Sequence, residues 1–251
     1  TKNDGENNLH SGLDFYHGRM WKVADADDTH VTFEMDSPDG DQGYPGALVM
    51  KVTYSLDEEN TLMIHYEAEP DQDTIINMTN HSYFNLNGHK SGDVLNHTLW
   101  LNADAFTPAD AASIPTGEIR SVEGTPMDFR TDKTIGKDIG ADYEPLVFGN
   151  GYDHNWVLKN EGEFDKVAEV AGDESGIHMS VLTDLPGVQI YTANFLDGVK
   201  GRDGAVYEMR DAICLETQYY PDAIHHENFP GPICKKGEKY DTRTAYRFRV
   251  K

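Results

Sequence analysis

Two polar stretches far apart in the chain carry the residues best suited to chemistry. The stretch 79–86 (TNHSYFNL) places His81 among small hydrogen-bonding side chains, with two aromatic rings directly behind it. Histidine gives and takes protons near neutral pH, and aromatic rings offer flat apolar faces on which a sugar ring can stack. The stretch 213–222 (ICLETQYYPD) offers Glu216 between an apolar run and a pair of tyrosines. These residue types predict acid–base chemistry on an uncharged, hydroxyl-rich ligand.

Three further polar side chains could help to hold such a ligand. His10 stands near a glycine, Asp153 lies near an amide and an indole, and Gln189 lies in a β-rich run. Each also has a structural interpretation. Asp153 can cap a turn, Gln189 can pair with a neighbouring strand, and His81 can be a hydrogen-bonded strand residue. On the residues alone both interpretations stay open.

The spacing of the remaining histidines does not predict a metal or an organic cofactor. No two histidines stand four residues apart on a plausible helix with a third ligand in view. His154 and the pair His225–His226 are interpreted as surface residues or as residues behind the binding groups. The chain has no GxxxxGK[ST] loop and no GxSxG elbow, so ATP binding and nucleophilic-serine chemistry have no support.

Composition limits the possible partners and the compartment. The 251 residues include 44 acidic and 21 basic side chains, a formal charge of −23 spread along the chain. Such a surface disfavours nucleic acids and anionic membranes and is typical of a solubilising exterior. The two cysteines, Cys214 and Cys234, form no CxxC pair, which predicts buried free thiols in a reducing cytoplasm.

Short strands must position these residues. Apolar positions alternate with polar ones at Leu62–Tyr66, 188–192 and 246–250, and turn signals such as Asn87-Gly88 and Pro186-Gly187 separate the runs. The pattern predicts an all-β fold, a sandwich or barrel of antiparallel sheets, with a short helical turn or two at 132–139. We expect Trp21, Trp100 and Trp156 in the core. Without repeats or linkers, one domain over residues 1–251 is the simplest organisation.

Six short stretches, taken in order along the chain, resemble the aldose 1-epimerases, also called galactose mutarotases. The similarity covers nearly the whole chain. The stretches are 7–12 (NNLHSG), 37–46 (SPDGDQGYPG), 80–86 (NHSYFNL), 153–155 (DHN), 187–191 (GVQIY) and 213–216 (ICLE).

The resemblance implies a fold, an activity and a role for each residue. The fold would be a large antiparallel β-sandwich with few short helices and a sugar in an open cleft. Glu216 would take the proton of the anomeric hydroxyl, and His81 would protonate the ring oxygen, so that the ring opens and closes on the other face. His10, Asp153 and Gln189 would hold sugar hydroxyls. The resemblance implies a monosaccharide substrate, no metal and no cofactor, and a monomer or homodimer.

One feature departs from the family pattern. The resemblance implies early strands and an Asn-Arg sugar-binding pair before residue 7, which this chain lacks. We expect one of three explanations: the chain is a fragment of a longer protein, or the early part lies in another polypeptide, or it is disordered and not included in the sequence. We also expect the 251 residues alone to be poorly soluble or weakly active.

Two alternatives to an epimerase stay open on the residues. One is a glycoside hydrolase on a related sandwich, with Asp153 and Glu216 as its carboxylate pair. The other is a sugar-binding module that has lost the reaction.

Overall fold

The structure is a computed structural model that describes residues 1–250, and it divides into two compact units. Unit 1 comprises Thr1–Asp57, Leu62–Ile76 and Pro232–Thr242, and unit 2 comprises Glu58–Thr61, Asn77–Gly231 and the chain from Arg243 onward. The single domain inferred from the sequence stays a prediction. None of the helices within residues 1–250 has the length and apolarity that crossing a bilayer requires.

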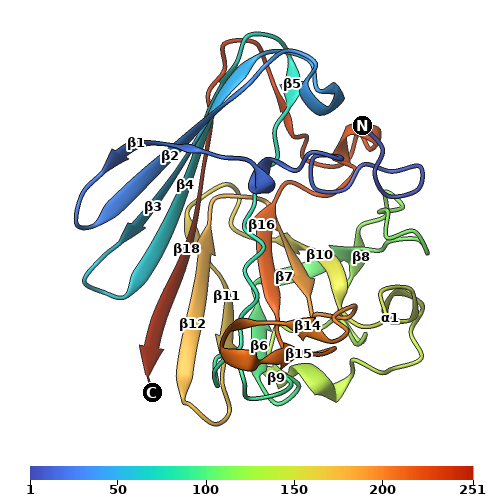
Figure 1. Ribbon diagram of the computed structural model, residues 1–251. Coiled ribbons are helices and arrows are strands. Elements are labelled where there is room, and N and C mark those ends of the chain that lie inside the picture. Colours follow the sequence, from blue (N-terminus) through green and yellow to red (C-terminus); the bar gives the residue numbers. More distant parts are fainter. Residues whose placement is uncertain (251) are drawn as a thin grey trace. The chain divides into compact units, whose positions relative to one another are not determined.

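Unit 1 is built on an antiparallel meander in the order β1-β2-β3-β4 (blue to cyan in Figure 1). The alternation predicted at 62–66 is confirmed, because Ile64 and Tyr66 are 1% and 3% exposed, whereas His65 and Glu67 are half-buried. The elements of this unit are the 3₁₀ turns η1 (Tyr16–Gly18) and η2 (Asp41–Gly43) and the strands β1 (Lys22–Ala26), β2 (His30–Ser37), β3 (Leu48–Leu56), β4 (Thr61–Pro70), β5 (Thr74–Ile75) and β17 (Ile233–Cys234).

Unit 2 contains two larger antiparallel sheets. One has the order β18-β12-β11-β6-β9 and the other the order β16-β13-β10-β7-β8. The first is built from β6 (Thr98–Leu101), β9 (Lys133–Thr134), β11 (Asp165–Ala171), β12 (Ile177–Thr183) and β18 (Tyr240–Val250). The second is built from β7 (Ala103–Thr107), β8 (Arg120–Ser121), β10 (Asp153–Leu158), β13 (Gly187–Tyr191) and β16 (Cys214–Gln218). The remaining elements are η3 (Ile135–Lys137), α1 (Glu144–Phe148), β14 (Val199–Lys200), η4 (Arg202–Gly204), β15 (Val206–Tyr207) and η5 (Ala223–His225).

The two larger sheets of unit 2 pack face to face, as the all-β sandwich prediction requires. The Tyr246 hydroxyl on β18 donates to the Leu215 carbonyl on β16 at 3.0 Å, and the hydroxyls of Thr217 and Thr244 bond across the same layer. Because side chains alternate along a strand, one face of each sheet can be apolar throughout. The largest fully buried side chains of this unit are Trp156, Tyr152, Tyr246, Phe106, Phe129, Leu99, Leu101, Met127, Ile135, Leu146 and Met179.

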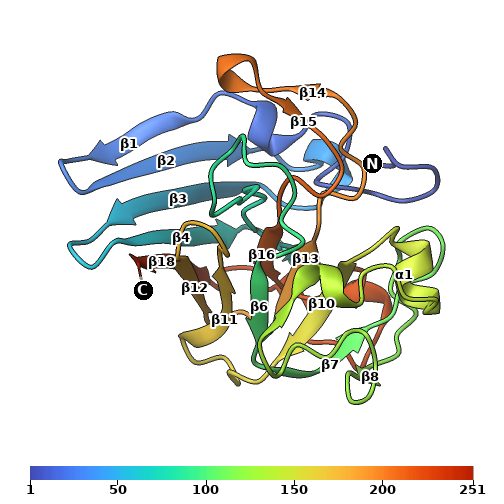
Figure 2. The same ribbon diagram turned by 90° about the horizontal axis from the view of Figure 1, so that it is seen from below.

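The predicted helical turn and one predicted core tryptophan are confirmed, and two core assignments are wrong. The 3₁₀ turn η3 falls within 132–139, whereas the short helix α1, seen beside β10 in Figure 2, was not predicted. Trp156 is fully buried, but Trp21 and Trp100 are partly exposed. Trp100 faces outward because its neighbours Leu99 and Leu101 both point into the core.

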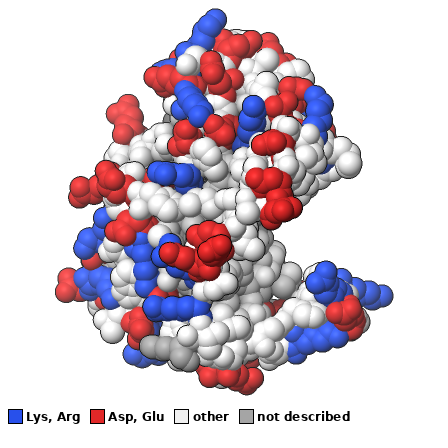
Figure 3. All heavy atoms as spheres, turned by 90° about the vertical axis from the view of Figure 1, so that its left-hand side faces the viewer, with Lys and Arg blue, Asp and Glu red and all other residues white. Residues whose placement is uncertain are grey.

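On the face of the molecule shown in Figure 3, charge is distributed rather than gathered at one place. On the face shown in Figure 3, acidic side chains are spread widely, with basic side chains among them. This distribution agrees with a solubilising role for the net charge of −23.

Candidate active site

Three neighbouring strands of unit 2 bring polar side chains onto one face of a sheet. Glu216 on β16 lies directly opposite Gln189 on β13, and Gln189 lies directly opposite Asn155 on β10. The adjacent row of the same face contains Tyr191 opposite Asp153. The other face of this sheet carries the apolar core. Because successive side chains of a strand point to opposite faces, the same strands supply both the core and the polar face.

Hydrogen bonds fix the amides and the carboxylate of this face. Gln218 Nε2 donates to Gln189 Oε1 at 3.3 Å, and Gln189 Nε2 donates to Asp153 Oδ1 at 2.8 Å. The relay fixes which end of the Gln189 amide faces Asp153. It also confirms that Gln189 pairs with neighbouring strands, the structural interpretation made from the sequence.

Gly187 leaves space for two side chains near this relay, Asn155 and Tyr220. A Cβ at position 187 would lie 2.4 Å from Asn155 Oδ1 and 2.9 Å from the Tyr220 ring. Both contacts are shorter than van der Waals packing permits, so a larger residue here would displace the side chains of the polar face.

His81 reaches Glu216 from a loop of irregular backbone. Its Nε2 lies 3.6 Å from Glu216 Oε1, with His81 partly exposed and Glu216 buried. Three residues beyond His81, Phe84 exchanges two backbone hydrogen bonds of 2.9 Å with Ile213, which stands three residues before Glu216. The loop is thereby tied to the start of β16.

Aromatic rings surround the exposed part of His81. The Tyr83 ring stacks on the imidazole with centroids 5.1 Å apart, and the Tyr191 ring meets it edge-on at 5.9 Å. Tyr83 is 48% exposed, so part of its apolar face is open to a ligand.

Burial gives the two carboxyl groups unusual acidities. It raises the pKa of Glu216 from 4.5 to about 8, and the nearby charge of Asp153 adds to the rise. Burial also raises the pKa of Asp153 from 3.8 to about 6, against the opposing effect of the hydrogen bond from Gln189. A carboxyl group with a raised pKa is a stronger base once ionised, which is the property that proton abstraction needs.

The structure brings together four of the five site residues named from the sequence. Glu216, His81, Asp153 and Gln189 all belong to unit 2. His10 belongs to unit 1, in the loop before β1, with a left-handed φ of 49°.

Three other side chains lie near these residues: His154, which was interpreted from the sequence, and Tyr191 and Gln218, which were not named as site residues. His154 is buried, and its Nδ1 accepts a hydrogen bond of 3.1 Å from the Asp153 N–H, so it lies behind the binding face rather than at the surface. Sequence reasoning missed Tyr191 and Gln218. Each stands two residues after a named site residue on the same strand, and that period-two spacing was the signal that could have found them.

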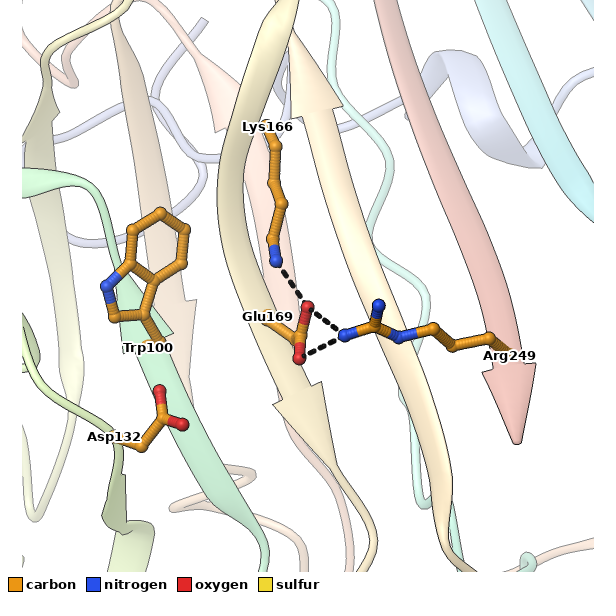
Figure 4. Close-up of a pocket in the computed structure, with 5 residues that line it drawn as sticks. All are labelled: Trp100, Asp132, Lys166, Glu169 and Arg249. Atoms are coloured by element: carbon orange, nitrogen blue, oxygen red, sulfur yellow. Dashed lines mark hydrogen bonds and ion pairs between the residues drawn. The ribbon is translucent and has the colours of Figure 1, made fainter. Parts of the chain in front are cut away.

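A hollow of unit 2, drawn in Figure 4, lies on the outer face of the sheet that contains β11 and β6. It has a volume of about 220 Å³ and is lined by Trp100, Asp132, Lys166, Glu169 and Arg249. Glu169 pairs with Lys166, with Arg249 at 2.9 Å and with His178 at 3.0 Å. Because Lys166, Arg249 and His178 all bind the Glu169 carboxylate, we interpret the hollow as a structural polar network.

In unit 1, three potential metal ligands also lie close together, which the sequence spacing did not reveal. His65, Glu67 and Asp241 offer ligand atoms within 4.8 Å of one another. The Lys239 ammonium lies 2.6 Å from Glu67 and 3.0 Å from Asp241, so a cation of the protein already pairs with both carboxylates.

Comparison with known proteins decides the family. Residues 1–247 match the family model described as aldose 1-epimerase. The chain belongs to the aldose 1-epimerase family. It is 43% identical over 249 residues to galactose mutarotase of Bos taurus, covering 99% of this chain and 71% of that protein. It is 38% identical over 251 residues to aldose 1-epimerase of Escherichia coli, covering 99% of this chain and 72% of that protein.

Solved structures agree with this family. The crystal structure of an aldose epimerase homologue from C. elegans matches with a TM-score of 0.89 and 31% identity, covering 99% of this chain and 74% of that one. The family resemblance, the antiparallel sandwich and the isomerase class predicted from the sequence are therefore confirmed. This aldose 1-epimerase interconverts the α and β anomers of aldoses, and the comparisons favour neither a hydrolase nor a binding module.

Proposed function

We propose that Glu216 is the general base and His81 the general acid of this epimerase. The observation that carries the proposal is the 3.6 Å separation between His81 Nε2 and Glu216 Oε1 on a sheet face rich in hydrogen-bonding groups. The anomeric hydroxyl oxygen O1 and the ring oxygen O5 are bonded to the same carbon, C1. Groups that exchange protons with these two oxygens must therefore be close neighbours, as these two are.

Proton movements balance in a ring opening followed by a ring closure. Ionised Glu216 takes the proton from O1, the O1 electron pair forms the aldehyde C=O, and the C1–O5 bond breaks. The electron pair of that bond goes to O5, which receives a proton from His81. After rotation about C1–C2, O5 attacks the opposite face of C1, His81 recovers its proton, and Glu216 returns its proton to O1. The enzyme ends in the form in which it began.

In the form that can react, Glu216 is ionised so that it can accept a proton, and His81 carries the proton that it donates. As the pH falls below the pKa of Glu216, which is about 8 in the absence of sugar, the base becomes protonated and kcat/KM is expected to fall.

We further propose that Asp153, Gln189 and His10 hold hydroxyl groups of the sugar. Asp153 accepts and Gln189 both donates and accepts hydrogen bonds, which suits the two roles of a hydroxyl group. The Tyr83 ring offers a flat apolar face beside His81. The substrate class is free hexoses such as galactose or glucose, and the bovine relative carries the name galactose mutarotase.

We also propose a cytoplasmic location and a monomeric or homodimeric state. Cys214 and Cys234 are both buried free thiols, which suits a reducing compartment.

Polarimetry of freshly dissolved α-D-galactose and α-D-glucose tests the assigned roles. We expect His81→Asn and Glu216→Gln each to lower kcat by about 10²–10⁴-fold, because each removes one proton-transfer group. His178→Asn and Glu169→Gln are matched controls on the other sheet of unit 2, and they should retain the wild-type rate. Near-normal rates for both site variants would overturn the assignment, and sugar binding without any acceleration by the wild type would establish a binding module instead.

A further inference from the structure

A histidine buried in unit 2 has its protonation state fixed by its surroundings. His97 is 0% exposed, and its Nε2 lies 3.0 Å from the Leu86 N–H, which donates to it. A nitrogen that accepts a hydrogen bond carries no proton, so the proton of the neutral ring is on Nδ1. Asp173 Oδ1 lies 3.3 Å from that Nδ1. Burial lowers the pKa of His97, although the charge of Asp173 opposes this, and the neutral form is retained.

Leu86, whose N–H donates to His97, belongs to the loop that carries His81. This loop has irregular backbone, so it lacks the ladder of hydrogen bonds that keeps a strand in place. Its middle is fixed by the backbone pair between Phe84 and Ile213. Its far end is fixed at Leu86 by the imidazole of His97.

Hydrogen bonds also connect the same end of the loop to the turn between β11 and β12. Asn87 Nδ2 donates to Asp173 Oδ1 at 3.0 Å, and Asn87 Oδ1 accepts two backbone N–H groups of the turn at 3.1 Å each. Close approach depends on Gly172, where a Cβ would lie 2.7 Å from Asn87 Oδ1 and 3.0 Å from Leu86 Cβ. Asp173 therefore contacts both the ring that holds Leu86 and the side chain that follows Leu86.

We propose that His97, oriented by Asp173, is a positioning residue for the general acid of this epimerase. It fixes the Leu86 end of the loop and so sets the distance between His81 and Glu216, without itself meeting the sugar. The inference rests on the role of His81 proposed above. A displacement of about 1 Å in a reacting group can cost about 10²-fold in rate, so a small shift of the loop is sufficient for a measurable effect.

Two substitutions at position 97 separate the hydrogen bond from the volume of the ring. His97→Phe keeps a ring of similar size but leaves the Leu86 N–H without an acceptor, and we expect kcat to fall at least about 10-fold with KM changed less than about 2-fold. His97→Gln supplies an amide oxygen and should recover most of the rate. Val170→Ala, a fully buried change on β11, controls for general destabilisation and should lower the melting temperature while leaving kcat unchanged.

NMR of the imidazole nitrogens gives a readout that does not depend on activity. We expect His97 to carry its proton on Nδ1 at pH 7, and a proton on Nε2 would overturn the inference even if His97→Phe failed to fold. Equal kcat in His97→Phe and wild type would also overturn it, provided that His81→Asn is impaired. If His81→Asn keeps the wild-type rate, the proposed catalytic pair has failed, and the positioning role fails with it.

Discussion

Replacing Glu216 by glutamine is expected to stabilise the protein at neutral pH while it removes the activity. The pKa of this carboxyl group rises from 4.5 to about 8 in the folded chain, first because of burial and second because of the charge of Asp153. The folded state therefore disfavours the ionised form. Glutamine has nearly the same shape and no charge to bury.

The sign and size of the effect follow from the two pKa values. Below pH 4.5 the carboxyl group is protonated in both states and costs nothing. As the pH rises from 4.5 towards 8, the unfolded chain loses the proton more readily than the folded chain, so the folded state loses stability. At pH 7, 2.5 pH units above the unfolded value, the loss is about 3 kcal/mol. For a chain of this length that corresponds to a rise in melting temperature of roughly 6–12 °C for Glu216→Gln.

Thermal unfolding of wild type and Glu216→Gln at pH 5 and pH 7 measures the effect. The gain should be large at pH 7 and below about 1 kcal/mol at pH 5. Glu169→Gln is the control of opposite sign. Burial by itself raises the pKa of Glu169, but the hydrogen bonds with Lys166 and His178 outweigh it and lower the value to about 2. Removing that charge should therefore destabilise the protein at pH 7.

Two outcomes would refute this reasoning. One is a Glu216→Gln variant no more stable than wild type at pH 7, and the other is an equal gain at pH 5 and pH 7. Either would mean that Glu216 is not an ionisable group whose charge the fold disfavours.

Two further substitutions test the same face of the sheet. Asp153→Asn removes a charge that raises the pKa of Glu216. The acidic limb of the pH profile of kcat/KM should therefore move to lower pH, and KM should rise. A limb that stays in place would show that the two carboxyl groups do not interact. Gly187→Ala places a Cβ 2.4 Å from Asn155 Oδ1 and 2.9 Å from the Tyr220 ring. Because these side chains must then shift, we expect the KM measured by polarimetry to rise several-fold. An unchanged KM would contradict the close packing at this position.

The strands that carry the site could be predicted from the sequence because their pattern is local. The run 188–192 and the alternation in 62–66 both correspond to observed strands, β13 and β4. A strand's period of two also dictates that Asp153 and Asn155, or Glu216 and Gln218, share a face. The residues of the polar face were therefore within reach of sequence reasoning once the strands were assigned.

Contacts between distant segments could not be predicted in the same way. The register that sets Glu216 opposite Gln189 depends on packing of whole strands, and the burial that raises its pKa depends on everything around it. The helix α1 has five residues, too few to show a helical period. His97 carried no signal at all, because its function lies in a hydrogen bond to Leu86 that only the fold creates.

Exchange NMR of the anomeric protons tests the central claim most directly, because it observes α and β anomers interconverting at equilibrium. With galactose in excess, wild-type protein should give exchange cross-peaks between the two anomers, and His81→Asn and Glu216→Gln should each abolish them while His178→Asn and Glu169→Gln do not. Exchange at the wild-type rate in either site variant would contradict the assignment of this pair as acid and base.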